Sequence, residues 1–512
     1  MTSERLREPA SLRTPVIIWS LVLAKLLFHL LTANRFGIFR DELYYLACAE
    51  HLDWGYVDQP PLIALVAWIA RHLFGESLFG LRLIPAIAGA GTVWITAKLA
   101  REIGGRVLAQ TLAAISVMAV PIYLIVHHWL TMNAWEPLIF AACALFVARA
   151  LRMGGERNWI PFGLVAGIGL ENKYTIVFFI AALVAGLLVT SARRQLASRY
   201  FWIGAAVAAA IFLPNFVWLV AHHFPFLELM HNIRGTNRDI TRAPVAFVLD
   251  QIMTLNPLTA PVWIAGLVWL VVARGGRAFA ALGWTFVFML TAIIVMRGKN
   301  YYLASAYPML FAAGGVAFEN IVGRRRWIAV AYAVVIIAGT AVVIPTISPI
   351  LSPDGTVAYQ RRLGIESPKF ENQETGPLPQ YFADEFGWEE MTRETARVYH
   401  SLPPEERART AIFANGYGQA GAIDFFGPRY GLPKCISNHQ NYWLWGPRNY
   451  DGSSVIVLGG DGSGDRKHFR SVEAVGQVAH PFSRRDEHFD IFLCRDFTGD
   501  LRTSWSGMKK WR

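Results

Sequence analysis

The sequence alternates long apolar segments with short polar ones, and this alternation restricts the fold more than any other feature. A bilayer core takes about 20 apolar residues per helix. Runs close to that length fill the first two thirds of the chain, at 15–33, 80–98, 107–126, 131–149, 158–170, 174–190, 200–221, 257–273, 278–296, 301–320 and 327–347. The sequence therefore predicts an all-α polytopic membrane protein with about 11 transmembrane helices.

Basic residues fall in alternate connections between these runs, as the positive-inside rule requires of cytoplasmic loops. Hydrophobic residues make up 54% of the chain and charged residues 17%, so we interpret the net charge of +11 as a topology signal. We expect membrane lipids, and not nucleic acid, as partners. The N-terminus is then cytoplasmic, and outward connections are expected at 34–79, 127–130, 171–173, 222–256 and 297–300. The shorter apolar stretch 60–74 is expected to lie flat on the membrane surface.

Composition changes after residue 347, where turn-forming and charged residues become frequent. We therefore divide the chain into a membrane domain at 1–347 and a small soluble α/β domain at 348–512 on the outward side. Strands are predicted at 410–414, 453–460 and 489–494, with a helical stretch at 388–402. An oxidising exterior would permit a disulfide between Cys435 and Cys494.

The outward stretch "RDELYY" places Asp41 and Glu42 shortly after the first predicted span. In a hydrated helix start, acidic residues in the first turn simply favour the helix dipole. The loop continues with aromatic and acidic residues, which would hold it against the bilayer. A carboxylate there can act as a general base on a hydroxyl arriving from outside. The residues are compatible with both interpretations.

Two further connections carry charge where the membrane makes it costly. Glu136 lies about one turn inside a predicted span, where an ionised side chain costs roughly 2.5–3.5 kcal/mol. Its spacing from Asn133 puts both on one helix face, as a structural clamp or as a contact to substrate or metal. In "GLENKY", Glu171 and Lys173 mark a turn between two short spans, where they either neutralise each other or bind substrate.

Arg297 and Lys299 form a basic turn on the predicted outer side, against the positive-inside trend. A phosphate at the outer leaflet would explain both, with a forked contact from arginine and a point charge from lysine. General contact with lipid headgroups is the alternative explanation. The following Tyr301 is included among the candidate substrate-binding residues.

Several of these segments together resemble the GT-C glycosyltransferases. They are the Asp-Glu pair, "DQPPL" before a surface helix, "TMNAWEPLIF", "GLENKY" and "GKNYYLASAYPMLFAAG". Within that group the chain is similar to the bacterial family 39 type, akin to protein O-mannosyltransferases, the lipid A aminoarabinose transferase and lipopolysaccharide-core galacturonosyltransferases. The resemblance covers about residues 10–347. It implies transfer of a sugar from a polyprenyl-phosphate carrier to a cell-envelope acceptor at the outer face of the cytoplasmic membrane.

The resemblance also implies roles for particular residues. Carried over by motif, Asp41 is the catalytic carboxylate, and Glu42 orients it or binds the acceptor. Such relatives often have a lysine before the Pro-Pro pair, where this chain has Gln59. This difference removes one expected contact to the donor phosphate and leaves the class of sugar undetermined. The preferred phosphate partners are then Lys173, Arg297 and Lys299.

We expect no obligatory cofactor or metal, although Glu136, His127 and Asp41 are candidate ligands for a divalent cation. The alternative function is a transporter or flippase of lipid-linked sugars. Such a protein would show paired broken helices, inverted repeats and charges at mid-membrane. Here the ionisable residues collect at the predicted outer edge, and the sequence shows no corresponding halves. We therefore prefer the glycosyltransferase interpretation.

Overall fold

The computed structural model describes residues 14–236, 240, 242–365, 372 and 374–511. Contacts between residues divide the chain into two units. Unit 1 comprises residues 1–33, 82–216 and 241–348, and unit 2 comprises residues 34–81, 217–240 and 349–512. The first outward loop of the sequence analysis therefore belongs to the same unit as the C-terminal part of the chain.

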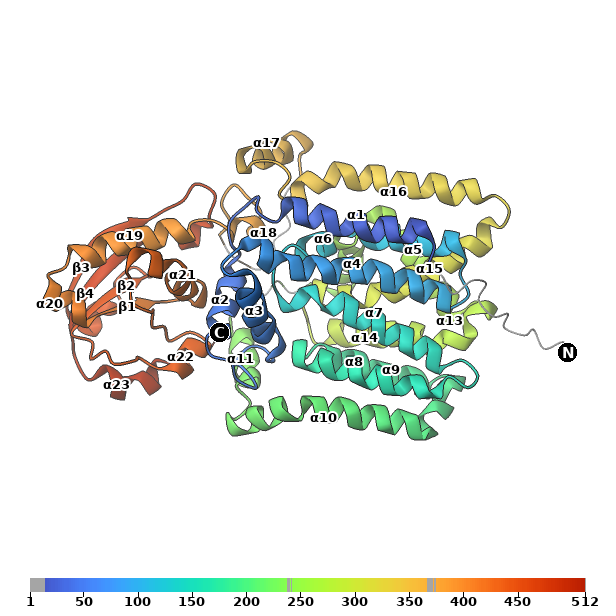
Figure 1. Ribbon diagram of the computed structural model, residues 1–512, viewed down its shortest axis with the longest axis horizontal. Helices are drawn as coiled ribbons and strands as arrows, with labels where there is room; N and C mark the ends of the chain where they lie inside the picture. The colour runs from blue at the N-terminus through green and yellow to red at the C-terminus, as the bar shows by residue number, and fades with distance from the viewer. Residues whose placement is uncertain (1–13, 237–239, 241, 366–371, 373, 512) are drawn as a thin grey trace. The chain divides into compact units, whose positions relative to one another are not determined.

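Unit 1 is an assembly of helices that run along a common direction (Figure 1). It contains most of α4 (Leu78–Glu102) and of α10 (Arg199–Ala221). The other helices of unit 1 are α1 (Val16–Thr32), α5 (Val107–Met118), α6 (Pro121–Val126), α7 (Glu136–Ala150), α8 (Trp159–Asn172), α9 (Ile176–Leu188), α12 (Pro244–Thr254), α13 (Ala260–Val271), α14 (Ala280–Val295), α15 (Tyr307–Val322) and α16 (Arg326–Ile347). Short 3-10 segments include η1 (Met132–Ala134), η2 (Glu156–Asn158), η3 (Ser191–Ala197), η4 (Pro257–Thr259), η5 (Arg274–Phe279) and η6 (Asn300–Ala306).

The number of membrane spans differs from the prediction. Among the described residues, 4 helices are long and apolar enough to cross a membrane, or up to 6 if each of two bent helix pairs counts as one span. About eleven spans is therefore not confirmed. Several predicted runs hold shorter or interrupted helices: the run 107–126, for example, is broken between α5 and α6, where Pro121 starts a new helix. The predicted division at "ENKY" is confirmed, because α8 ends at Asn172 and α9 begins at Ile176.

The outer helices of unit 1 present apolar side chains that the rest of the structure does not cover. On α16, Trp327 is 69% exposed and Val334 is 58% exposed, and on α10 Trp202 is 63% exposed. A surface of this kind would be unfavourable in water and suits hydrocarbon chains. The protein is accordingly a multi-pass membrane protein.

Close helix packing in unit 1 depends on glycines. Gly314 of α15 faces the backbone of α13, where an added Cβ would collide with the carbonyl oxygen of Val262. Gly266 of α13 makes the reciprocal approach to the carbonyl of Leu310. Small residues at helix contacts are the usual means of close approach in membranes, where dispersion contacts replace the hydrophobic effect.

Unit 2 combines helices with one four-stranded sheet. The sheet has the order β1-β2-β4-β3, with β1 (Thr410–Ala414) parallel to β2 (Ser454–Leu458) and the pairs β2–β4 and β3–β4 antiparallel. The remaining strands are β3 (Phe469–Val478) and β4 (Phe489–Phe497). The helices include α2 (Arg40–Ala49), α3 (Leu62–Phe74), α11 (Pro225–Arg234), α17 (Pro353–Leu363), α18 (Gln380–Ala383), α19 (Trp388–Ser401), α20 (Pro404–Arg409), α21 (Tyr417–Phe426), α22 (Asn441–Trp445) and α23 (Leu501–Ser504). Short 3-10 turns are η7 (Gly427–Tyr430), η8 (Asp465–Lys467), η9 (Arg485–Glu487) and η10 (Trp505–Met508).

Most of the predicted C-terminal elements are present, and β3 was missed. The predicted strands correspond to β1, β2 and β4, and the helical stretch 388–402 corresponds to α19. Strand β3 lies at the edge of the sheet, where charged, polar and glycine residues separate its valines and the register shifts between Ala474 and Gly476, which gives a weak strand signal. Cys435 and Cys494 are both buried and free, so the disulfide that we allowed between them is not formed.

We predict that Gly314→Ala destabilises the protein by roughly 1–3 kcal/mol, because the new methyl group must separate α15 from the α13 backbone. Thermal unfolding of the detergent-solubilised protein measures this effect. The matched control is Gly275→Ala, whose Cβ would meet its nearest atom, Trp269 Nε1, at an ordinary 3.5 Å. Equal melting temperatures for the two variants would contradict the packing argument.

Candidate active site

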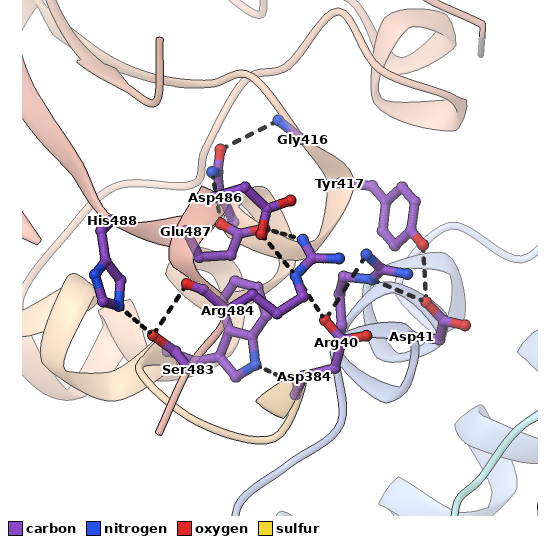
Figure 2. A network of polar contacts seen from close by, with 12 residues as sticks. Arg40, Asp41, Asp384, Gly416, Tyr417, Ser483, Arg484, Asp486, Glu487 and His488 are labelled. Carbon is purple, nitrogen blue, oxygen red and sulfur yellow. Dashed lines mark hydrogen bonds and ion pairs between the residues drawn. The ribbon is translucent and has the colours of Figure 1, made fainter. Parts of the chain in front are cut away.

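Asp41 occupies the first turn of α2, in unit 2 (Figure 2). Its side chain is 27% exposed, so it remains accessible. The phenolic hydroxyl of Tyr417, at the start of α21, donates a hydrogen bond of 2.8 Å to Asp41 Oδ1. The Nε of Arg40 lies 3.5 Å from the same oxygen. Both contacts fall on one carboxylate oxygen.

Glu42, the other residue of the predicted catalytic pair, is placed differently. Its side chain turns back to the helix start, where Oε2 accepts a hydrogen bond of 2.9 Å from the backbone N–H of Phe39. This is the carboxylate arm of a capping box, which satisfies a backbone donor that the helix leaves open. Glu42 is fully buried, at 0% exposure. The geometry thus gives Glu42 a structural task at the start of α2.

A buried ionic cluster fixes the backbone beside Asp41. The N–H of Arg40 donates to the main-chain oxygen of Asp384 at 3.0 Å, and its guanidinium lies 3.8 Å from the Asp384 carboxylate. The same carboxylate is 3.2 Å from Arg484 Nε, and the exposed fractions of the Asp384 and Arg484 side chains are only 3% and 4%. Burial raises the pKa of Asp384, and the positive charges of Arg40 and Arg484 oppose that rise.

The cluster closes into a ring of contacts (Figure 2). Arg484 pairs with Glu487 at 2.7 Å, and Glu487 accepts a hydrogen bond of 2.9 Å from Gln419 of α21. Gln419 Oε1 in turn accepts from the backbone N–H of Gly416 at 3.2 Å. Gly416 directly precedes Tyr417, so the ring returns to the residue that holds Asp41.

Gln59, where relatives were expected to carry lysine, is buried at 0% exposure. Its amide Nε2 lies 3.7 Å from Cys48 Sγ, so the side chain is directed into unit 2. The adjacent Asp58 accepts a hydrogen bond of 2.9 Å from Tyr44. Asn441 donates to that tyrosine oxygen at 2.6 Å and accepts from the backbone N–H of Val57 at 3.0 Å. The "DQPP" turn is therefore held on both sides of Asp58.

A second polar cluster lies in unit 1 and is centred on Lys173. The ammonium group donates to Asn133 Oδ1 at 2.6 Å and to Glu136 Oε2 at 2.8 Å. It also lies over the ring of Tyr302 at 4.9 Å and over that of Tyr301 at 5.9 Å. The structure thus brings together four of the predicted substrate-binding residues. Thr175 adds a hydroxyl donor to the other Glu136 oxygen.

The other predicted residues of unit 1 lie outside this cluster of hydrogen bonds and ion pairs. The idea that Glu171 and Lys173 neutralise each other is corrected, because the ion partner of Lys173 is Glu136. Glu171 is half-buried at the end of α8, and its Oε1 is buried without a hydrogen-bond partner among the described residues. Arg297 is exposed in the turn after α14, with φ 54°, and Lys299 is half-buried before η6.

Within the ranges that the structure describes, no three His, Cys, Asp or Glu side chains gather so that they could hold a metal ion. Of the candidate cation ligands, Glu136 has one oxygen on Lys173 and the other on Thr175. His127 is fully buried in unit 1, whereas Asp41 belongs to unit 2.

Comparisons with known proteins agree with this architecture. A family model described as dolichyl-phosphate-mannose-protein mannosyltransferase matches residues 58–218, which is less than half of the chain. The chain is similar to the lipid A galacturonosyltransferase RgtD of Rhizobium johnstonii, at 27% identity over 38% of this chain and 41% of that protein. It is also similar to an undecaprenyl phosphate-alpha-4-amino-4-deoxy-L-arabinose arabinosyl transferase of Pseudomonas fluorescens, at 27% identity over 40% of this chain and 38% of that protein.

Solved structures extend the likeness over nearly the whole chain. ArnT from Cupriavidus metallidurans, bound to undecaprenyl phosphate, matches with a TM-score of 0.60 and 14% identity, covering 93% of this chain and 97% of ArnT. Arabinofuranosyltransferase AftD from mycobacteria matches with a TM-score of 0.52 and 15% identity, covering 96% of this chain and 41% of AftD. These matches show that the chain has an ArnT-like GT-C fold.

The GT-C fold agrees with the predicted class, a helical membrane protein with a small C-terminal sheet. At these identities the structural likeness shows the fold alone. The chain spans about two fifths of the length of the curated relatives that it matches, 41% and 38%. The activity of this chain therefore has to be inferred from its own residues.

Sequence reasoning missed the residues that hold Asp41. Tyr417 lies 376 positions away from Asp41, and no local pattern links the two. Asp384 and Arg484 are likewise separated by most of the C-terminal segment, in stretches that look like ordinary polar loops. A usable signal was the glycine-rich "GYGQAG", which permits a helix to approach another backbone closely.

We predict strong energetic coupling between Glu136 and Lys173. Glu136→Gln and Lys173→Met should each cost about 3–5 kcal/mol, because each leaves the partner charge buried. The double variant should cost less than the sum by at least about 1 kcal/mol. Chemical unfolding in detergent measures all three. The same cycle on the more exposed pair Arg397 and Glu394 is the control, with coupling below about 1 kcal/mol; additive costs at Glu136 and Lys173 would contradict the pairing.

Proposed function

We propose that the protein is a glycosyltransferase that moves a sugar from a polyprenyl-phosphate carrier to an acceptor at the outer face of the cytoplasmic membrane. The observation that carries the proposal is the accessible carboxylate of Asp41, fixed through one oxygen by Tyr417 and Arg40. A general base needs both a held geometry and access to its substrate. The matched family model and the names of the curated relatives support the same reaction class.

The proposed reaction needs few groups. Asp41 takes the proton of an acceptor hydroxyl as the acceptor oxygen bonds to the anomeric carbon. The bond from that carbon to the carrier phosphate breaks, and its electron pair leaves with the phosphate. Since phosphate is a stable leaving anion, the enzyme gains most by stabilising its charge in the transition state. Inversion at the anomeric carbon follows from a single displacement.

Arg297 and Lys299 are the proposed partners of the donor phosphate. The exposed Arg297 can give a forked contact and Lys299 a point charge. Lys173 uses two ammonium hydrogens on Asn133 and Glu136, and we propose that its third serves a phosphate oxygen. Tyr301, whose ring lies beside the ammonium group of Lys173, is then part of the same phosphate-binding site.

The finer assignments are part of the same proposal. We propose that residues 1–347 form the membrane transferase domain, with a cytoplasmic N-terminus, and that 348–512 lie outside the cell membrane. The donor sugar is a hexosyl or pentosyl unit, as the galacturonosyl and aminoarabinosyl names of the relatives suggest. The acceptor is a hydroxyl of a cell-envelope lipid, glycan or protein. We propose that Glu42 does not contact the acceptor directly and that it contributes only by capping the start of α2.

We predict that Asp41→Asn lowers transfer by roughly 100-fold to 10,000-fold, the range for loss of a general base. Asparagine keeps an acceptor for Tyr417, so the fold should be retained. Transfer is measured in membranes with donor lipids extracted from the producing cells, by mass spectrometry of the modified envelope. Asp53→Asn, an exposed carboxylate of the same loop, is the control and should retain activity. Full activity of Asp41→Asn would exclude the proposed role.

We further predict that Arg297→Ala and Lys299→Ala raise the apparent KM for the donor lipid by about tenfold each, since each loses a charged contact to phosphate. The apparent KM for the acceptor should change little. Steady-state assays in which donor and acceptor are varied separately measure the two effects. Arg277→Ala in η5 removes a basic residue from a different turn and should alter neither. Equal increases for donor and acceptor would exclude phosphate recognition.

A further inference from the structure

The C-terminal segment of unit 2 touches the carboxylate to which the proposed chemistry is assigned. We propose that Tyr417 is a positioning residue for Asp41, and that residues 349–512 thereby complete the catalytic centre. This inference rests on the proposed function, in which Asp41 is the base. It gives the C-terminal segment a task in catalysis that neither the family model, which ends at residue 218, nor the sequence analysis assigns.

The two carboxylate oxygens of Asp41 have different surroundings. Tyr417 and Arg40 both contact Oδ1, at 2.8 Å and 3.5 Å. Oδ1 is therefore the held oxygen, and Oδ2 is the one that would take the acceptor proton. Hydrogen bonds to an ionised group are about twice as strong as neutral ones, so the phenol is an effective clamp. A carboxylate without the clamp would rotate and leave the attacking geometry more often.

Tyr417 is itself rigidly held. Its ring stacks on His439 with centroids 5.2 Å apart and an interplanar angle of 7°. The ring of Tyr44 packs against that of Tyr417 with centroids 4.7 Å apart, and the guanidinium of Arg40 lies 5.5 Å from the centre of the Tyr417 ring. The backbone N–H of Tyr417 donates to His439 Nδ1 at 3.1 Å. The hydroxyl therefore has little freedom to leave Asp41.

Helix α21 can bring Tyr417 to Asp41 because two glycines face α2. A Cβ at Gly421 would lie 2.9 Å from the backbone carbonyl carbon and oxygen of Leu43. At Gly418 it would lie 2.5 Å from Arg40 Cγ. Backbone atoms cannot yield as a flexible side chain can, so Gly421 sets the separation of the two helices. Their spacing at positions i and i+3 puts both glycines on one face of α21.

The C-terminal segment holds the first outward loop at a second place. Asn441 contacts Tyr44, which donates to Asp58, and also accepts from the N–H of Val57. Burial raises the pKa of Tyr45, and the charges of Asp41 and Asp58 add to that rise. Thus Tyr417 holds the loop at Asp41, and Asn441 holds it beside Asp58 through Val57 and Tyr44.

The experiment compares Tyr417→Phe with Tyr430→Phe in the full-length protein. Tyr430 donates to Glu389 at the same 2.8 Å within unit 2, so the control removes an equivalent hydroxyl contact elsewhere. We expect kcat to fall by roughly 10-fold to 100-fold in Tyr417→Phe, with the apparent KM for extracted donor lipids unchanged, because one bond to a charged group is lost. Tyr430→Phe should retain kcat. Hydrogen exchange of the peptide 40–49 should rise only in Tyr417→Phe.

Coupling to Asp41 separates positioning from a general loss of structure. In Asp41→Asn, adding Tyr417→Phe should cause no further fall in the residual rate, since the clamp then has no base to hold. Equal kcat for Tyr417→Phe and Tyr430→Phe, with Asp41→Asn inactive, would overturn the positioning role and leave the proposed function intact. Full activity of Asp41→Asn would instead remove the proposed function itself. Additive losses in the double variant would also overturn the inference.

A second variant tests the same role without touching the tyrosine. Gly421→Ala should push α21 away from Leu43 and lower kcat by about tenfold, with faster hydrogen exchange in 40–49. Gly464→Ala, where nothing lies within 4 Å of the added Cβ, is the control and should match the wild type. Unchanged kcat and exchange in Gly421→Ala would contradict the proposed dependence of Asp41 on α21.

Discussion

The arrangement of unit 2 depends on the buried ion pairs that Asp384 forms with Arg40 and Arg484. Burial alone favours the neutral acid, and its pKa is raised despite the two guanidinium groups. Buried ion pairs contribute little net stability, because desolvation offsets the attraction. What such a pair supplies is geometry, because the loss of one partner leaves the remaining buried charges less well compensated. The cluster therefore fixes where the α2 backbone begins, and with it the direction of Asp41.

Asp41 and Glu42 divide two tasks between adjacent carboxylates. Glu42 accepts a hydrogen bond from the backbone N–H of Phe39 and is buried, whereas Asp41 stays partly exposed in the first turn of α2. Both acids also lie in the first turn of α2, where negative charge stabilises the helix dipole. One acid thus builds the helix start that presents the other. A sequence pattern that reads as a catalytic pair can equally be one reactive group and its support.

The sequence predicted those features that local patterns determine. Runs rich in branched residues located β1, β2 and β4, and the excessive length of 158–190 located the break between α8 and α9. The spacing of Asn133 and Glu136 predicted one helix face, but Asn133 lies in η1 and Glu136 begins α7. The two side chains nevertheless meet, because both bind Lys173. Each of these inferences needs only neighbours within a few turns.

Features that depend on distant contacts could not be predicted in the same way. Strand β3 forms through its pairing with β4, and its own sequence gives only a weak strand signal. The eleven apolar runs were counted as if each were one straight helix, but prolines and short turns interrupt several of them. Tyr417, Asp384 and Arg484 come together only through tertiary packing, so no spacing rule could identify them.

The contact between α2 and α21 bears on how a membrane glycosyltransferase can control its chemistry. A base on an outward loop would be mobile if the loop were held only by its own hydrogen bonds, and a mobile base loses the gain from fixed orientation. In unit 2 the loop is instead held by residues of the C-terminal segment, at Asp41 through Tyr417 and at Asp58 through Tyr44 and Asn441. Any movement of α21 relative to α2 would then change the orientation of the carboxylate directly. If Asp41 is the base, as proposed, the C-terminal segment is part of the reacting centre and not an appended domain.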